Sequence, residues 1–435
     1  MLQGLDAINW HNLEHAYGPA GDVPGLLRDL ASRDEQTRES AHYELYGNLY
    51  HQGTIYEPTA FAVPFLLRLV ADESVPDRSW ILAYLANLAR GTSFINVHQH
   101  LPEIFPNLAP GSRTPEVEAQ LAQELQWVED VHSAVRKGLP LYLRLLDHSD
   151  ATIRSAATFP LARFKEDASS TMPALGRRLS VETVPDVRVR IILGLAALQS
   201  DTAARIALYV GAFENEPSRR TKLLLALAAL DDLGDDAPQG AVAYIVEALP
   251  HVLKAHLAKE AALKQMQGGA RPIPQLQRID MLGDEDGDET GEPSTQVLEF
   301  ARELMIFNGL ASLYPNLYHV SETLRNVEYR RLQPAIPALI AALKAYGGAP
   351  EAIFSIWSSV VQTLVYAAFG VKPELEAEPS VSRPRRQELT ADQRATLRAI
   401  ADSEVLWRFS GNAQSLLEPL GVPYERAQLR ALLSS

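Results

Sequence analysis

Three residues near the start of the chain have the types and spacing of a zinc-binding motif. His11, Glu14 and His15 form the sequence His-x-x-Glu-His, the inverted form of a zinc-protease signature. On a helix, His11 and His15 would lie on one face, as zinc ligation requires. One alternative function is therefore a metal-dependent hydrolase. The other interpretation is a polar helix that caps the N-terminus, and we favour it because too little chain surrounds the motif to enclose a cleft.

Two other groups have the composition of metal sites, but each has a simpler explanation. His98 and His100 form a His-x-His pair in a proline-rich stretch, 91–114, that we expect to be a loop, and no third ligand is near in sequence. The acidic stretch from Asp284 to Glu292 lacks the glycine and the final glutamate of a calcium loop. The chain has no cysteine and no phosphate-binding or serine-elbow motif. We therefore expect no metal, no cofactor and no catalytic residue.

Aromatic side chains form the candidate binding residues. Several tyrosines surround the connection at 51–59, and a second group recurs at helical spacing in the segment 78–91. Tyrosine and tryptophan are enriched at protein interfaces, but they also fill the core between helices. Both interpretations stay open from the sequence. The candidate partner-binding residues are Tyr43, Tyr46, His51, Tyr56, Trp80, Tyr84 and Asn87.

A repeated phrase predicts the elements that carry these residues. An apolar residue, a proline and a leucine-rich turn recur at 23–30, 63–70, 139–146, 172–179 and 336–343. We expect each phrase to begin a helix, because proline suits the first helical turn. In the first four copies a short break and a second helix follow; Ser32 and Glu35 have the spacing of a capping box before the first of these. Helical hairpins repeated at about 35–40 residues are typical of an α-solenoid.

The chain resembles the HEAT-repeat (armadillo-type) proteins of bacteria. The resemblance rests on the first-helix prolines and on aspartate and arginine residues of the turns and second helices. It implies an all-α fold, a right-handed α-solenoid of HEAT-like hairpins, in which the aspartates and arginines form a hydrogen-bonded ladder between stacked repeats. The ladder residues would be Asp34, Arg38, Asp77, Asp150, Arg154, Asp186 and Arg188.

The expected organisation has five parts. HEAT-like repeats occupy 1–265, interrupted by an inserted helix at 115–137 that Thr114 would cap. A flexible acidic insertion follows at 266–295, then degenerate repeats at 296–371, a linker at 372–389, and a helical C-terminal cap at 390–435 in which Thr390 and Gln393 have capping-box spacing.

Composition restricts the partner and the compartment. The net charge is −14, and the pI is near 5.3, which disfavours nucleic acid and favours a neutral or basic protein. Residues 352–371 carry no charge, yet their polar residues lie on one helical stripe: Ser355, Ser358, Ser359, Gln362 and Thr363. We therefore expect a helix that packs on a neighbour or a partner rather than a membrane span. Without cysteines or a signal-like N-terminus, we expect a cytoplasmic protein.

These observations favour a non-enzymatic scaffold that binds another protein. The HEAT resemblance narrows this to an immunity protein that neutralises a basic toxin, since similar bacterial proteins include such antidotes. The alternative is a HEAT-fold enzyme, similar to DNA glycosylases or to bilin lyases, or the hydrolase above. The acidity of the chain opposes a glycosylase, which needs a basic groove.

Overall fold

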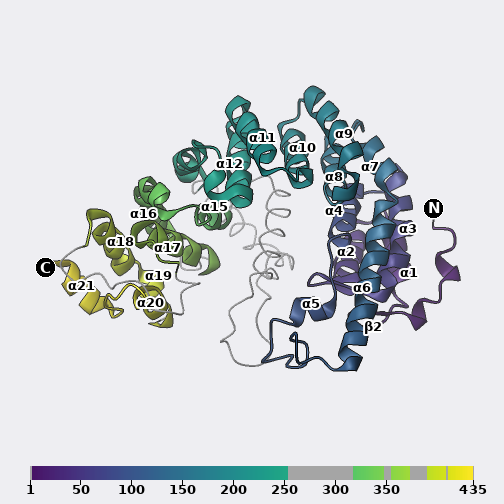
Figure 1. The fold of residues 1–435 in the computed structure, drawn as a ribbon, viewed down its shortest axis with the longest axis horizontal. Coiled ribbons are helices and arrows are strands. Elements are labelled where there is room, and N and C mark those ends of the chain that lie inside the picture. Colours follow the sequence, from purple (N-terminus) through teal and green to yellow (C-terminus); the bar gives the residue numbers. More distant parts are fainter. Residues whose placement is uncertain (1, 253–316, 347–353, 373–388, 408–409, 435) are drawn as a thin grey trace. The chain divides into compact units, whose positions relative to one another are not determined.

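The computed structural model describes residues 2–252, 317–346, 354–372, 389–407 and 410–434 (Figure 1). Contacts between Cα atoms divide the described residues into two units, one up to Arg205 and one from Ile206 onward, which are described separately. The expected acidic insertion 266–295, the first part of the expected repeats 296–371 and nearly all of the linker 372–389 lie outside the described residues.

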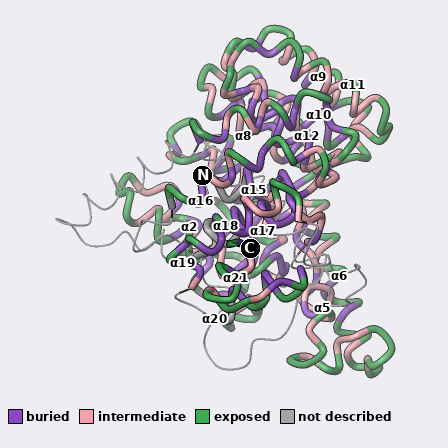
Figure 2. The backbone as a smooth tube through the Cα atoms, turned by 90° about the vertical axis from the view of Figure 1, so that its left-hand side faces the viewer, coloured by how far each residue is buried: buried purple, intermediate pink, exposed green. Residues whose placement is uncertain are grey.

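The first unit is built from four stacked helical hairpins. They pair α1 (Val23–Asp29) with α2 (Glu35–Leu49), α3 (Glu57–Ala71) with α4 (Arg78–Leu88), α7 (Leu139–Leu145) with α8 (Ala151–Leu161), and α9 (Ala168–Val181) with α10 (Pro185–Leu198). In the last three hairpins the second helices pack in sequence, α8 on α4 and α10 on α8. Buried residues lie mainly along the helices, and exposed residues are frequent in the turns between them (Figure 2). The predicted all-α architecture of helical hairpins is therefore confirmed in the described residues.

An insertion separates the second and third hairpins without interrupting their stacking. The expected loop 91–114 contains a short helix, α5 (Phe94–His98), which Ser93 caps by accepting from the Asn96 amide at 3.0 Å. The expectation of a plain loop was therefore wrong in this part. The long helix that follows is α6 (Pro115–Arg136), with Thr114 as its N-cap, and it packs along α3. Because α6 lies against α3, α8 can still reach α4.

Gly138 allows the close packing where the insertion ends. A Cβ atom at this position would lie 2.3 Å from the Tyr142 hydroxyl oxygen and 2.6 Å from Cδ2 of Leu67 on α3. The Tyr142 hydroxyl, in turn, donates to the Val135 carbonyl at 3.0 Å. Only glycine leaves room for both contacts, so this residue holds α7 tightly against α3 and the end of α6.

The helix starts differ in part from the sequence expectation. Pro24, Pro140 and Pro337 lie in the first turn of their helices, but Pro64 and Pro173 lie inside α3 and α9. Helices α3 and α9 begin several residues before these prolines. Both prolines lie on exposed positions, where a helix best tolerates the loss of a backbone hydrogen bond.

The cap of α2 also differs from the expected Ser32–Glu35 box. Asp34 is the N-cap, and its carboxylate accepts from the Thr37 amide at 2.8 Å and the Thr37 hydroxyl at 2.6 Å. Ser32 instead accepts from the Asp34 amide at 3.1 Å. The N-cap is thus Asp34, two residues later than the Ser32 that the spacing predicted.

The β-strands of the described residues form two short antiparallel hairpins. The first joins β1 (Glu14–His15) to β2 (Gly18–Pro19), and the second joins β3 (Tyr50–His51) to β4 (Thr54–Ile55) between α2 and α3. The 3₁₀ turns η1 (Leu5–Ala7) and η2 (Trp10–Asn12) precede β1. The expected N-terminal cap helix was therefore wrong.

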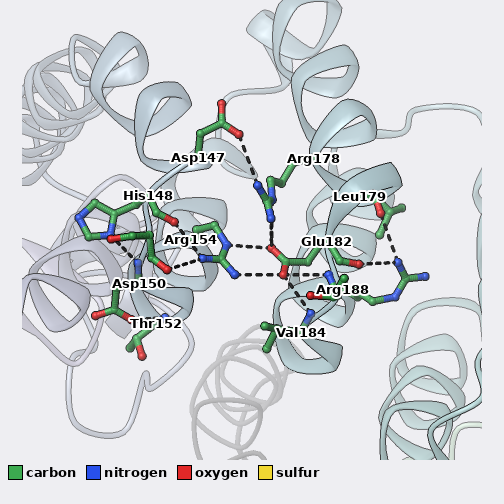
Figure 3. Close-up of polar contacts among 12 residues, drawn as sticks. Asp147, His148, Asp150, Thr152, Arg154, Arg178, Leu179, Glu182, Val184 and Arg188 are labelled. Carbon is green, nitrogen blue, oxygen red and sulfur yellow. Dashed lines mark hydrogen bonds and ion pairs between the residues drawn. The ribbon is translucent and has the colours of Figure 1, made fainter.

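A polar ladder connects the hairpins of the first unit. Arg38 donates to Asp77 of the next hairpin at 2.6 Å, and Arg154 donates two bonds, at 2.8 and 3.0 Å, to Glu182 of the next hairpin (Figure 3). Both arginines also bond the carbonyl groups of their own turns. These side chains therefore tie the turn of the first hairpin to that of the second, and the turn of the third hairpin to that of the fourth.

The acids of this ladder are partly different from those expected. Asp150, like Asp34, caps its own helix, accepting from the Thr152 amide at 2.7 Å. Asp186 lies in the first turn of α10, directly after Pro185. The acceptor for Arg154 is instead Glu182, four residues earlier in the sequence. Arg188 donates to the carbonyl groups of Leu179 and Glu182. The resemblance therefore assigned the arginines to the right turns but did not identify Glu182.

The second unit contains further helices of the same kind. These are most of α11 (Thr202–Asn215), then α12 (Arg219–Leu233), α15 (Leu317–Leu324), η5 (Tyr329–Ala335), α16 (Ile336–Tyr346) and α17 (Phe354–Phe369). The small polar stripe of α17 packs on α15: Ser359 donates to Glu322 at 2.6 Å, and Thr363 donates to the Ser321 carbonyl at 2.9 Å. Among the helices of the described residues, none combines the length and apolar composition of a membrane span.

The last helices are α18 (Ala391–Asp402), α19 (Glu404–Trp407), α20 (Ser410–Leu417) and α21 (Arg426–Ser434). α18 packs on α16, α17 and α21. Thr390 and Gln393 form a capping box, with reciprocal bonds of 3.2 and 3.0 Å.

Candidate protein-interaction surface

A column of aromatic rings joins the first two hairpins. The His42 ring of α2 stacks on Trp80 of α4 at 3.9 Å, and Trp80 stacks on Tyr84 at 4.9 Å. Tyr84 is 1% exposed, and its hydroxyl donates to the Leu45 carbonyl at 2.6 Å. Tyr84 therefore packs between repeats, whereas Trp80 and Asn87 are half-buried.

Tyr46 extends the same column toward the β3–β4 hairpin. Its ring lies 6.2 Å from Tyr84 and 5.3 Å from Tyr50. Burial raises the pKa of Tyr46 to about 12 and raises that of Tyr84 further. These phenols stay protonated at neutral pH, so they contribute packing and hydrogen bonds rather than acid–base chemistry.

Tyr17 adds an exposed aromatic ring that the sequence did not suggest. It lies in the turn between β1 and β2 and is 68% exposed. Its hydroxyl lies 3.1 Å from Nδ1 of His51, and the two rings meet edge to face at 5.3 Å. A lone tyrosine in a polar N-terminal segment carries no pattern, so only the tertiary contact with His51, 34 residues later, identifies it.

The N-terminal segment is held in place by polar contacts beneath Tyr17. The Ala16 amide donates to the Asn48 carbonyl at 3.2 Å, which attaches the β1–β2 turn to the end of α2. Asp22 binds both the His15 ring, at 3.0 Å, and the Asn48 amide group, at 2.7 Å. Tyr17 is therefore presented on a supported turn.

Tyr43 is the second exposed ring, 57% exposed on α2. It is the exposed member of the aromatic group predicted around the connection 51–59, and Tyr17 is an exposed ring outside that group. His51 and Tyr56 are half-buried. Burial lowers the pKa of His51, with a smaller contribution from His98, so that His51 is neutral near pH 7; burial also raises the pKa of Tyr56 to about 12.

The zinc-type motif does not form the geometry that its spacing requires. His11 lies in η2, whereas Glu14 and His15 lie in β1, so the two histidines do not share a helical face. His15 is buried against Asp22, and the His11 ring covers Gly21, where a Cβ would lie 2.3 Å from its Cε1 atom. These side chains support the packing of the N-terminal segment.

The histidine pair of the insertion is similarly separated. His98 is buried, with Nδ1 2.9 Å from the Phe94 carbonyl oxygen, whereas His100 is exposed. Within the described ranges, no three histidine or acidic side chains are grouped so as to hold a metal ion.

The comparisons with known proteins add a distant structural likeness. No protein-family model matches the chain, and no curated protein matches it. The solved structure of UNC-45 from Drosophila melanogaster is similar over 95% of this chain and 70% of its own, with 12% sequence identity and a TM-score of 0.23. The helical-repeat architecture is therefore assigned from the stacked hairpins of the chain itself.

Proposed function

We propose that this protein is a helical-repeat scaffold that binds another protein without performing catalysis. One observation carries the proposal: the first two helical hairpins hold a packed aromatic column, and two further rings, Tyr17 of the β1–β2 turn and Tyr43 of α2, are exposed to solvent. Exposed tyrosine on a rigid support is the composition that binding surfaces favour.

The stacked hairpins supply the rigidity that this binding requires. Helix packing and the ladder of Arg38 with Asp77 and Arg154 with Glu182 restrict the surface before a partner arrives. A surface that is already ordered loses little conformational entropy on binding. The mechanism is then contact area on a fixed scaffold.

The finer form of the proposal is an immunity protein that neutralises a basic toxin. The net charge of −14 supports it, because an acidic surface attracts a basic partner and accelerates their association. The immunity-protein proposal further predicts that the partner is inhibited in a one-to-one complex.

The test is reconstitution with purified components. The tagged full chain is crosslinked in its native cell, the crosslinked protein is purified separately, and the affinity and stoichiometry are measured by calorimetry. An unrelated acidic protein of similar net charge is the control, because it reveals capture by charge alone. A defined complex that the control does not form is the expected result.

Two results contradict the proposal. One is the absence of any crosslinked protein that binds the purified chain more tightly than the control protein does. The other is tight binding to duplex DNA near 0.15 M salt, which would favour the nucleic-acid enzymes of this fold instead.

A further inference from the structure

One exposed face of the first hairpin combines aromatic rings with acidic side chains. It comprises the stripe of α2 opposite Leu45 and Leu49, together with Tyr17 from the β1–β2 turn. We call it the α2 face, and its residues are Tyr17, Gln36, Glu39, Ser40, Tyr43, Glu44 and Gly47. Positions 36, 39, 40, 43, 44 and 47 recur at helical spacing, so they form one continuous strip.

The charge of the α2 face is negative. Glu39 and Glu44 are exposed on it, and Glu35 lies at its N-terminal border. Arg38 is the single cation of α2, and it is turned toward Asp77 and the carbonyl groups of its own turn. Arg33 is exposed in the turn before the helix.

The two exposed rings lie near one another on this face. Tyr17 Cε2 would be 3.6 Å from a Cβ at Gly47, which places the ring against the last turns of α2. Tyr43 precedes Gly47 by four residues, one helical turn, and therefore lies on the same side. The bond from Tyr17 to His51 holds the first ring in position.

We infer that the α2 face docks a lysine- or arginine-rich segment of the partner protein. The inference rests on the proposed function and names the chemistry of the partner. A cation over a tyrosine ring is attracted by the π-electrons, and glutamates beside the ring add a charge-assisted hydrogen bond. A face with two rings and two flanking glutamates satisfies both interactions for each cationic side chain.

Charge complementarity favours this occupant over a second copy of the chain. A second copy would bring the same glutamates and another net charge of −14. Like charges at an interface oppose association. The cationic partner is therefore the one to which the face is complementary.

The test uses a fluorescein-labelled oligolysine peptide as the probe and an oligoglutamate peptide of equal length as the control ligand. Fluorescence anisotropy measures the dissociation constant of the full chain at about 0.05 and 0.15 M salt, which separates contact from long-range attraction. We expect oligolysine to bind and oligoglutamate not to bind.

Charge-matched variants locate the site. The double variant Glu39→Lys with Glu44→Lys reverses the charge of the α2 face. The double variant Glu73→Lys with Glu103→Lys makes the same change in net charge at exposed positions elsewhere. We expect the first pair to weaken oligolysine binding about tenfold and the second about twofold or less. Equal losses would show that only the net charge matters and would overturn the inference.

Aromatic variants test the rings. Tyr17→Ala with Tyr43→Ala should weaken binding about fivefold to tenfold, whereas Tyr424→Ala, which removes an exposed tyrosine of the second unit, should have no effect. Circular dichroism and urea unfolding verify that each variant is folded. Unchanged binding of the folded double variant would overturn the inference.

Two further outcomes separate this inference from the proposed function. If the reconstituted partner binds the charge-reversed variant and the tyrosine-to-alanine variant of the α2 face as tightly as it binds the native chain, the proposed scaffold function is retained and the α2 face is not the binding site. If sedimentation shows a dimer that Tyr43→Ala dissociates, the occupant of the face is a second copy, and the cationic segment is refuted.

Discussion

Glu182 is the residue whose replacement tests the stacking of the repeats most directly. Its side chain is 0% exposed. It accepts from Arg154 at 2.8 and 3.0 Å, from Arg178 at 3.0 Å, and from the amides of Thr183 and Val184 at 3.1 and 3.0 Å (Figure 3). The variant Glu182→Gln keeps the size of the side chain, removes its charge, and turns an amide N–H group or a weaker acceptor toward the two guanidinium groups.

The expected loss can be estimated in two ways. Burial alone would raise the pKa of Glu182, but the hydrogen bonds from Arg154, the Val184 amide and Arg178 outweigh it and hold the pKa at about 2, below the ordinary 4.5. At about 1.36 kcal/mol per pKa unit, this difference corresponds to about 3 kcal/mol. Breaking one side of a buried ion pair costs about 3–5 kcal/mol. We therefore expect Glu182→Gln to reduce the free energy of unfolding of the first unit by about 3 kcal/mol at pH 7.

The pH dependence has a defined sign. Because the folded pKa lies below the unfolded one, the unfolded chain binds more protons between these values, and stability falls as the pH falls. The contribution of Glu182 is complete above about pH 4.5 and is lost as the pH decreases through about 2. The native chain should lose more stability in this interval than Glu182→Gln does.

The assay is hydrogen exchange on peptides from α8 to α10, combined with urea unfolding of the full chain. Exchange reports the first unit separately, which a single unfolding curve of a chain with two units does not. Glu166→Gln is the matched control, because Glu166 is 40% exposed and lies 3.6 Å from Arg136; an exposed pair contributes about 1 kcal/mol or less. Equal losses in the two variants, or identical acid profiles for Glu182→Gln and the native chain, would refute the role given to Glu182.

Three other substitutions test separate contacts by urea unfolding with hydrogen exchange. Gly138→Ala should destabilise the first unit by about 1–3 kcal/mol, because its methyl group would overlap Tyr142 and Leu67. Gly176→Ala is the control and should be neutral or stabilising, because there is open space around the new atom. A Gly138→Ala variant as stable as the native chain would contradict the close approach of these side chains. Tyr84→Phe should cost about 1–2 kcal/mol, since the buried Leu45 carbonyl loses the hydroxyl that donates to it, and no loss would mean that another donor replaces it. Thr390→Ala should lower the stability of the last helices by about 1 kcal/mol, with Thr390→Ser retaining most of it, and equal losses in both would argue against the capping box.

Much of the candidate surface was within reach of sequence reasoning, but its exposed part was not. Tyr43 and the group around 51–59 were identified from aromatic crowding alone. The sequence did not separate the buried Tyr84 from the exposed Tyr43, because both occur in helices with similar neighbours. Tyr17 and His42 carried no signal, since each acquires its aromatic partner from a segment 34 or more residues away.

The chain alone determined the helical hairpins, because their signals are local. A proline in a first turn, an aspartate that accepts from an amide two or three residues later, and a leucine at every helical turn act within a few residues of one another. Tertiary structure decided which residues meet between hairpins. Three such contacts depend on the register and separation of stacked helices: the hydrogen bonds of Arg154 to Glu182, the packing of α6 beside α3, and the contact of Tyr17 with His51. These quantities arise from packing over distances of tens of residues, and no local pattern encodes them.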